Sequence, residues 1–416
     1  MSFSDWNEMV LEDVIQFNPR ESIKKGTVAK KIGMDKLTPF RRKISGYEIV
    51  EFKSGTKFRN GDTLLARITP CLENGKTAQV SILNDDEVAF GSTEFIVMRE
   101  KMGETLNDYI YYLSISDEFR NIAIKSMTGT SGRQRAQKDV LEKIKMLIPP
   151  IEEQKAIAHI LLTLDKKIET NNQINKTLEN MAQAIFKQWF VDFEFPNEDG
   201  VTYKSSGGQM VENELGMIPV GWEIKTLNDI SKEIITGKTP SKKNPDNFGE
   251  EVPFVKIPDM HGNPFIVETS EYLSESGANN KKVIPKNGLM ISCIATPGLV
   301  SIASENCQTN QQINSMILED EYMLYYTYFK LNDLADYIRT LGSTGSATLN
   351  LNKGEFSKIK IIVPEKALVN KFYYAVNEMF ESILLNMKMN ISLINMRDTL
   401  LPKLMSGEIR VPLEDN

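Results

Sequence analysis

Two stretches of the sequence repeat the same coiled-coil seam, and each carries two asparagines at its centre. Mainly apolar residues recur at alternating steps of four and three, the spacing of buried positions in a coiled coil. The central asparagines are Asn171 and Asn175 in the first stretch and Asn386 and Asn390 in the second, at a constant offset of 215 residues. Paired polar residues at the same two core positions are uncommon, so the chain is an internal duplication. The two seams are Ile157, Leu161, Leu164, Ile168, Asn171, Asn175, Leu178, Ala182, Ile185 and Trp189, and Phe372, Val376, Met379, Ile383, Asn386, Asn390, Leu393, Arg397, Leu400 and Leu404.

The duplication extends beyond the helices, but there the offset drifts. A constant offset within the helices indicates a shared scaffold, and a drifting one indicates that the segments before them diverged. The matching segments are Trp6–Val14 with Trp222–Ile230, Gly61–Pro70 with Gly288–Pro297, and Lys143–Pro150 with Lys358–Glu365.

Each diverged segment is predicted to be mixed and rich in β-structure. Short apolar runs bounded by Gly, Asn, Asp or Pro are typical of strands, and they occur at Thr63–Ile68, Glu94–Met98, Leu289–Ile294 and Ile359–Val363. Residues 107–125 and 320–341 have the apolar spacing of helices. The predicted fold class is α+β, with two mixed α/β domains separated by two long coiled-coil helices. The predicted segments are a first globular domain at 1–150, a spacer helix at 151–192, a linker at 193–215, a second globular domain at 216–365 and a second spacer helix at 366–416.

The two helices are predicted to pair antiparallel, which would relate the copies by a pseudo-two-fold axis. In that arrangement Asn171 and Asn175 face Asn390 and Asn386. An asparagine opposite an apolar residue leaves its amide unsatisfied, whereas asparagine opposite asparagine satisfies both and fixes the register. Pro402 breaks helix geometry, so we expect the second seam to weaken or kink before its last position.

The composition excludes several classes of site. Only two histidines occur, His159 and His261, which argues against histidine-activated nucleophiles and histidine-rich metal sites. The three cysteines have no ligand-like spacing. No signal peptide and no membrane-length apolar run is evident, so a cytoplasmic location without membrane contact is expected. No catalytic residue and no metal ligand is predicted.

Local charge points to candidate contacts with nucleic acid. The net charge is −7, but phosphate binding needs a basic surface rather than a basic protein. Arginine can read guanine with two hydrogen bonds, and Asn and Gln suit adenine. Each candidate could equally be a surface or turn residue with no such role. The candidates are Arg67, Asn74 and Lys76 around one turn, Arg133, Gln134 and Arg135 in a Gly-rich loop, Lys238, Lys242 and Lys243 in a second-copy loop, and Asn350, Asn352 and Lys353 in the counterpart of the Gly-rich loop. Because that counterpart has no Arg, the two copies should prefer different sequences.

Motifs for chemistry are missing. The sequence has no NPPY-like or DPPY-like methylation motif and no FxGxG-like cofactor loop. Gly237-Lys238-Thr239 looks like the end of a phosphate-binding P-loop, but position 232, where a glycine should precede it, is Lys. We therefore expect Lys238 to belong to a loop that faces DNA rather than to a nucleotide site.

Several segments, in order along the chain, resemble the specificity subunit of type I restriction–modification systems. They cover essentially the full sequence, and their order makes the resemblance specific. The segments are ARITPCLENGK (66–76), FGSTEFIV (90–97), IPPIEEQKAIAHIL (148–161), ELGMIPVGWEIKTLNDI (214–230), ITGKTPSKKNP (235–245), NQQIN (310–314) and LLPKLMSGEI (400–409).

The resemblance implies a non-catalytic subunit that reads a split, non-palindromic target in double-stranded DNA. Each globular domain would be a target-recognition domain for one half, and the helices would set the gap between the halves. Two methyltransferase subunits would dock and modify adenine with S-adenosylmethionine. A restriction/translocase subunit would use ATP and Mg. This chain itself would then hold no cofactor.

Two other classes of function stay open. The chain could be a two-headed structural or adaptor protein that binds protein partners through a coiled-coil spacer. It could also be a self-sufficient DNA-modifying enzyme, although the missing motifs argue against that.

Overall fold

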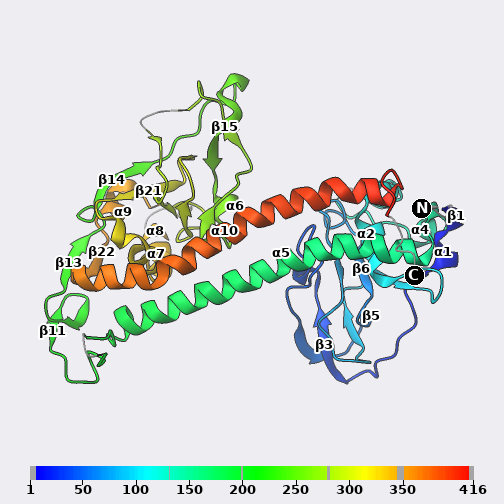
Figure 1. Cartoon of the computed structure of the whole chain (residues 1–416), viewed down its shortest axis with the longest axis horizontal. Coiled ribbons are helices and arrows are strands. Elements are labelled where there is room, and N and C mark those ends of the chain that lie inside the picture. The colour runs from blue at the N-terminus through cyan, green and yellow to red at the C-terminus, as the bar shows by residue number, and fades with distance from the viewer. Residues whose placement is uncertain (1–5, 131, 198–199, 279–281, 344–350, 412–416) are drawn as a thin grey trace. The chain divides into compact units, whose positions relative to one another are not determined.

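The computed structural model describes residues 6–130, 132–197, 200–278, 282–343 and 351–411 (Figure 1). The chain forms two compact units, one of residues 1–170 with 390–416 and one of residues 171–389. Each unit therefore takes in half of each long helix, and for this reason the units differ from the segments predicted along the sequence. No helix among the described residues is long and apolar enough to cross a membrane.

The first unit contains two four-stranded sheets and a two-stranded ladder. One sheet has the strand order β2-β9-β6-β7, the other has the order β4-β3-β8-β5, and β1 pairs with β10. The strands are β1 (Asn7–Val10), β2 (Ile15–Phe17), β3 (Val28–Ile32), β4 (Glu48–Glu51), β5 (Thr56–Phe58), β6 (Thr63–Ala66), β7 (Thr77–Gln79), β8 (Ala89–Gly91), β9 (Phe95–Glu100) and β10 (Lys145–Ile148). The shorter helices are α1 (Leu11–Val14), η1 (Met34–Lys36), α2 (Asn107–Ile115), α3 (Asp117–Lys125) and α4 (Lys138–Glu142).

The second unit repeats this topology with additions. Its main sheet has the order β14-β21-β18-β19-β16, in which β14-β21-β18-β19 corresponds to β2-β9-β6-β7, and β13 pairs with β22 as β1 pairs with β10. Separate sheets are formed by β17-β15-β20 and β11-β12. The strands are β11 (Met210–Asn213), β12 (Gly216–Pro219), β13 (Glu223–Thr226), β14 (Ser231–Thr236), β15 (Phe248–Val255), β16 (Phe265–Ile266), β17 (Tyr272–Leu273), β18 (Leu289–Ser292), β19 (Val300–Ala303), β20 (Gln308–Thr309), β21 (Ile313–Leu318) and β22 (Lys360–Val363). The shorter helices are η3 (Pro245–Asn247), α6 (Ile257–Met260), η5 (Glu321–Met323), α7 (Leu324–Asp333), α8 (Ala335–Ser343) and α9 (Lys353–Ser357). The shared strand order confirms the duplication.

Two long helices carry the predicted seams. They are α5 (Ile151–Phe186), which continues into the π-helical turn η2 (Lys187–Val191), and α10 (Lys366–Met405). Figure 1 draws both as uninterrupted coils. α5 begins after Pro149 and Pro150, and the Pro150 carbonyl accepts hydrogen bonds from the backbone N–H groups of Glu153 and Gln154 at 2.9 Å each. Acidic residues in the first turn favour this end of the helix because they oppose the helix dipole.

All twenty predicted seam positions are buried or half-buried, and none is exposed. This confirms the heptad prediction for both helices. The expected weakening at Pro402 is wrong, because α10 continues through this residue to Met405 and the seam residue Leu404 is only 2% exposed. The proline removes one backbone N–H donor from the helix, and α10 ends three residues later.

Within each unit the helices pack antiparallel, as predicted. In the first unit Asp165 of α5 pairs with Arg397 of α10, while Glu153, earlier in α5, pairs with Arg410 beyond the end of α10. In the second unit Phe186 packs on Phe372 with ring centroids 6.1 Å apart. The predicted pseudo-two-fold axis would relate one unit to the other, and it stays a prediction.

The residues that follow each long helix pack on a tryptophan at the start of a globular domain. Residues after α10 pack on Trp6, and residues after α5 pack on Trp222. In the first unit the Arg410 guanidinium lies 5.5 Å from the Trp6 ring, and the indole N–H of Trp6 donates to Glu153 at 3.0 Å. In the second unit Phe195 stacks on Trp222 with ring centroids 5.5 Å apart. Each unit thus combines the globular part of one copy with the end of the opposite helix.

Candidate nucleic-acid interface

In the first unit the structure brings the predicted contact residues together at the end of β6. The Arg67 N–H donates to the Glu94 carbonyl at 2.9 Å, and the Arg67 carbonyl accepts from the N–H of Ala136 at 2.7 Å. The Thr69 N–H donates to the Gln134 carbonyl at 3.0 Å. These backbone bonds place the Gly-rich loop directly against the strand end.

The turn after β6 carries Asn74 and Lys76, and these two side chains differ in their exposure to solvent and in their hydrogen bonds. Asn74 is exposed. Lys76 is half-buried, and its ammonium donates to the Met34 carbonyl at 3.0 Å. The turn therefore presents Asn74, whereas Lys76 also ties the turn to the preceding segment.

Arg135 is held by an acid that the sequence does not place near it. Its guanidinium donates to both carboxylate oxygens of Glu94, at distances of 2.7 to 3.0 Å. This hydrogen-bonded guanidinium lowers the pKa of Glu94 below its ordinary value, opposed by partial burial. By contrast, Arg133 is exposed. The two arginines of the Gly-rich loop therefore lie in different environments.

In the second unit the corresponding residues lie in two loops. Lys238, Lys242 and Lys243 follow β14 and are exposed, and the Lys238 N–H donates to the Thr309 carbonyl at 2.9 Å. Among the described residues, no α-helix directly follows this loop, because the next elements are the three-residue turn η3 and the strand β15. This agrees with the rejection of a P-loop, in which a helix N-terminus cradles the phosphate.

Of the counterpart of the Gly-rich loop, the structure describes the residues from Leu351 onward. Asn352 caps α9, with its side-chain oxygen accepting from the Glu355 N–H at 3.0 Å, so it has a structural role, and Lys353 is exposed. Asn350 lies outside the described residues. The Leu351 N–H donates to the Cys293 carbonyl at 2.9 Å, which places this loop on the end of β18 as its counterpart lies on β6.

One of the two predicted contacts between the helix-pair asparagines is present. The Asn386 amide donates to the Asn175 side-chain oxygen at 2.9 Å, as the antiparallel register predicts. Asn171 and Asn390 are both buried, but they belong to different units, and their pairing stays a prediction.

Sequence reasoning missed four residues of the first unit that lie at or next to this turn. The Phe40 N–H donates to the Gly75 carbonyl at 3.0 Å, and the Arg120 guanidinium of α3 donates to the carbonyls of Leu72 and Glu73 at 3.4 and 3.2 Å. Arg41 and Lys43 follow Phe40. The basic run KLTPFRRK (36–43) could have identified the loop cations. No local pattern marks Arg120, because only the tertiary contacts bring α3 to this turn.

We call residues 38–43, 67–76, 128–130 and 132–135 the first-unit loop cluster. It contains seven Lys or Arg residues and one acidic residue, Glu73. Two of these cations are paired with acids outside the cluster, Arg42 with Glu169 and Arg135 with Glu94. The exposed Lys43 and Arg133 suit a phosphate backbone, although the net charge of the chain is −7.

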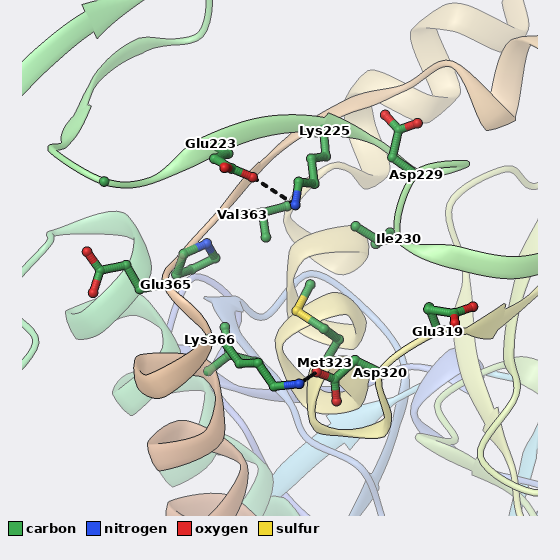
Figure 2. A pocket seen from close by; sticks show the side chains of 13 residues that line it. Glu223, Lys225, Asp229, Ile230, Glu319, Asp320, Met323, Val363, Glu365 and Lys366 are labelled. Carbon is green, nitrogen blue, oxygen red and sulfur yellow. Dashed lines mark ion pairs between the residues drawn. The ribbon is translucent and has the colours of Figure 1, made fainter.

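A pocket of the second unit has the opposite character. Figure 2 shows this cavity of about 370 Å³ beside the start of α10, with Lys366 paired to Asp320 and Lys225 paired to Glu223, each at 2.8 Å. Three more carboxylates, from Asp229, Glu319 and Glu365, also line it. Because its lining is mainly acidic, it does not suit DNA. Within the described ranges, no group of three or more His, Cys, Asp or Glu residues could hold a metal ion.

Comparisons with known proteins agree with this arrangement. The sequence model described as the type I restriction modification DNA specificity domain matches twice, at residues 3–180 and 219–368. The type I restriction enzyme HindI specificity subunit of Haemophilus influenzae is 37% identical, over 88% of this chain and 90% of that protein. The MjaIX specificity subunit of Methanocaldococcus jannaschii is 29% identical, over 74% of this chain and 70% of that protein.

One solved structure shows the same fold. The crystal structure of a type I restriction–modification system S subunit from M. genitalium has a TM-score of 0.58 and 15% sequence identity, and the alignment covers 96% of each chain. The double match of the family model already spans more than half of the sequence. The chain therefore belongs to the family of type I restriction–modification DNA specificity subunits.

Proposed function

We propose that this chain reads a bipartite, non-palindromic sequence in double-stranded DNA, one half-site for each unit. The observation that carries the proposal is the repeated fold with unlike loops. Both units present a loop at the end of the same central strand, but the first presents Arg133 and Arg135, whereas the second has Lys353 and no arginine. Two readers with different side chains select different bases.

In this proposal the chain is non-catalytic and directs other subunits to the target. Two methyltransferase subunits bind S-adenosylmethionine and modify the DNA, and a restriction/translocase subunit uses ATP and Mg. The support is family membership and the absence of methylation and cofactor motifs from the sequence. α5 and α10 then act as the spacer between the half-sites.

The test is methylation profiling of DNA from cells that carry this chain with its methyltransferase partner. We expect one split motif with unlike halves. The motif should disappear when this chain is deleted and the methyltransferase is kept. Purified complex should bind a duplex with that motif in a salt-dependent manner, because phosphate contacts release counterions.

Two outcomes would contradict the proposal. If the reconstituted complex has no DNA preference, a two-headed adaptor for protein partners becomes the better explanation. If this chain alone transfers methyl groups to DNA, it is an enzyme in its own right.

A further inference from the structure

Phe40 has an exposed side chain on a strained backbone. Its backbone has φ = 54°, in the left-handed region that bulky residues rarely occupy. The residue is 48% exposed, so burial of the ring does not account for this conformation. Strained residues persist where the surrounding structure over-determines them, and they cluster at functional sites.

Two neighbours fix the ring. A Cβ atom at Gly75 would lie 2.5 Å from the tip of the Phe40 ring, so only glycine allows the ring to lie against this turn. On another side, the guanidinium carbon of Arg120 is 4.8 Å from the ring centroid, within the range of a cation–π contact. Arg120 is itself anchored to the carbonyls of Leu72 and Glu73. The exposed ring is therefore preorganised by two segments, the turn that contains Gly75 and the helix α3 that carries Arg120.

The ring also lies in basic surroundings. Gly75, on which the ring rests, stands between the predicted contact residues Asn74 and Lys76, and the exposed Lys43 follows Phe40 in the same loop. This setting favours a polyanion over an acidic or apolar protein surface. In many nucleic-acid-binding proteins, aromatic side chains stack on single bases while nearby cations bind the phosphate backbone. The fixed Phe40 ring and its neighbouring cations have the same combination.

We propose that Phe40 is a stacking residue of the first half-site, packing against a base at an opened step of the bound DNA, with Arg120 fixing the ring from behind. The inference rests on the proposed function and adds a residue to it. Side chains that enter a base step partly unstack it, and methyltransferases take their target base out of the stack, which opens a step. Because the cost of opening depends on the step, Phe40 would contribute to sequence preference without hydrogen bonds to a base edge.

The experiment compares Phe40→Asn and Phe40→Trp with wild type in the full complex, on a duplex that carries the profiled motif. Asn tolerates positive φ, so the loop conformation survives the loss of the ring. We expect Phe40→Asn to raise Kd about 10-fold, in the range of one base–aromatic stack. The slope of log Kd against log salt should not change, because no phosphate contact is lost. Phe40→Trp should retain most of the affinity.

The matched control is Tyr47→Asn. Tyr47 is also an exposed aromatic residue of the first unit, 41% exposed and 4.7 Å from the Lys30 ammonium, but it lies outside the loop cluster. It should leave Kd unchanged, and all variants should unfold at the wild-type temperature.

The failures are distinguishable. If wild type binds no split duplex, the proposed function fails. If wild type binds and Phe40→Asn binds equally well, only the inference about Phe40 fails. If the Phe40→Asn chain no longer binds the methyltransferase subunit but binds DNA by itself as tightly as the wild-type chain does, the ring contacts protein. That result would overturn the inference.

Discussion

The side chain of Arg135 shows how far a single residue depends on its tertiary partners. The Gly-rich loop supplies the arginine, but Glu94 accepts its hydrogen bonds and orients it. Electrostatic attraction from Arg135 and Arg67 also favours the ionised carboxylate of Glu94. If Arg135 contacts DNA as proposed, Glu94 both positions its guanidinium and competes with DNA phosphate for it.

Replacing Glu94 with Gln tests this competition. The variant removes the negative charge that Arg135 of the loop cluster contacts and leaves Arg135 free to contact phosphate. We expect tighter binding to any duplex, and a salt slope steeper by about one unit because one more phosphate is neutralised. Titrations at several salt concentrations on specific and random duplexes measure both. Weaker binding to random DNA in Glu94→Gln would contradict the competition.

The same pair predicts a pH dependence of stability. The pKa of Glu94 is lowered in the folded state, so the pair stabilises the fold above the ordinary glutamate pKa, and the contribution is lost as pH falls through the lowered value. The effect should be small, because the side chains of Arg135 and Glu94 are 43% and 23% exposed. Urea unfolding of wild type and Glu94→Gln should differ at neutral pH and converge in acid. A difference that grew in acid would contradict this sign.

At the scale of whole elements, the two ends of the helix pair use different chemistry at duplicated positions. In the first unit Arg397 and Asp165 form an ion pair at 2.8 Å, with each side chain 5% exposed, and the Tyr112 hydroxyl donates to Asp165 at 2.8 Å. Burial opposes the charge of Arg397, but the carboxylates of Asp165 and Asp398 hold its pKa above the ordinary value. At the same offset of 215 residues, the second unit has Phe380 for Asp165 and Ala182 for Arg397.

This difference selects which helices pair. If α10 paired with a second α10 in the same register, Arg397 would face Phe380, and in an α5 pair Asp165 would face Ala182. Either arrangement buries a charge without a partner, which costs several kcal/mol. The ion pair therefore favours α5 with α10 over like with like, although the two seams share a heptad pattern.

Arg397→Met should destabilise the first unit by about 3–5 kcal/mol, because it leaves Asp165 buried without its cation. Adding Asp165→Leu should recover much of the loss, since no buried charge then stands alone. Urea unfolding of the single and double variants measures this. If the double variant were less stable than Arg397→Met, the loss of stability in Arg397→Met would not come from the unpaired carboxylate of Asp165.

The asparagine pair of the second unit makes a different prediction. Asn175→Leu alone should destabilise because it leaves the Asn386 amide without its 2.9 Å partner. Replacing both with Leu should raise the melting temperature but loosen the register, as apolar cores accept several registers. Cysteine pairs placed in the native register and one heptad away report the register by crosslinking. If the double variant crosslinked only in the native register, the asparagines would not be what fixes it.

At the scale of the whole molecule, the proposed function makes the long helices the spacer that sets the distance between the half-sites. Seven residues inserted into α5 after Thr170 and seven into α10 before Asn390 preserve both seams. Each insertion lengthens its helix by about 10 Å at 1.5 Å per residue, or roughly three base pairs of DNA. Methylation profiling should then show the same two half-sites with about three more unread base pairs. Unchanged spacing, or changed half-sites, would contradict the spacer role.

The sequence by itself determined the duplication, the two long helices and their seams, because heptad spacing and repeated segments are local patterns of the chain. It also determined the strands at β6 and β18 and the asparagine register, since Asn386 meets Asn175 as the antiparallel pairing requires. Only the tertiary structure decided which cations stand near which acids. It placed Glu94 on Arg135, Arg397 on Asp165, and the Phe40 ring between Gly75 and Arg120. These contacts join residues far apart in the chain, and no periodicity encodes them. They form only when the sheets and helices have packed.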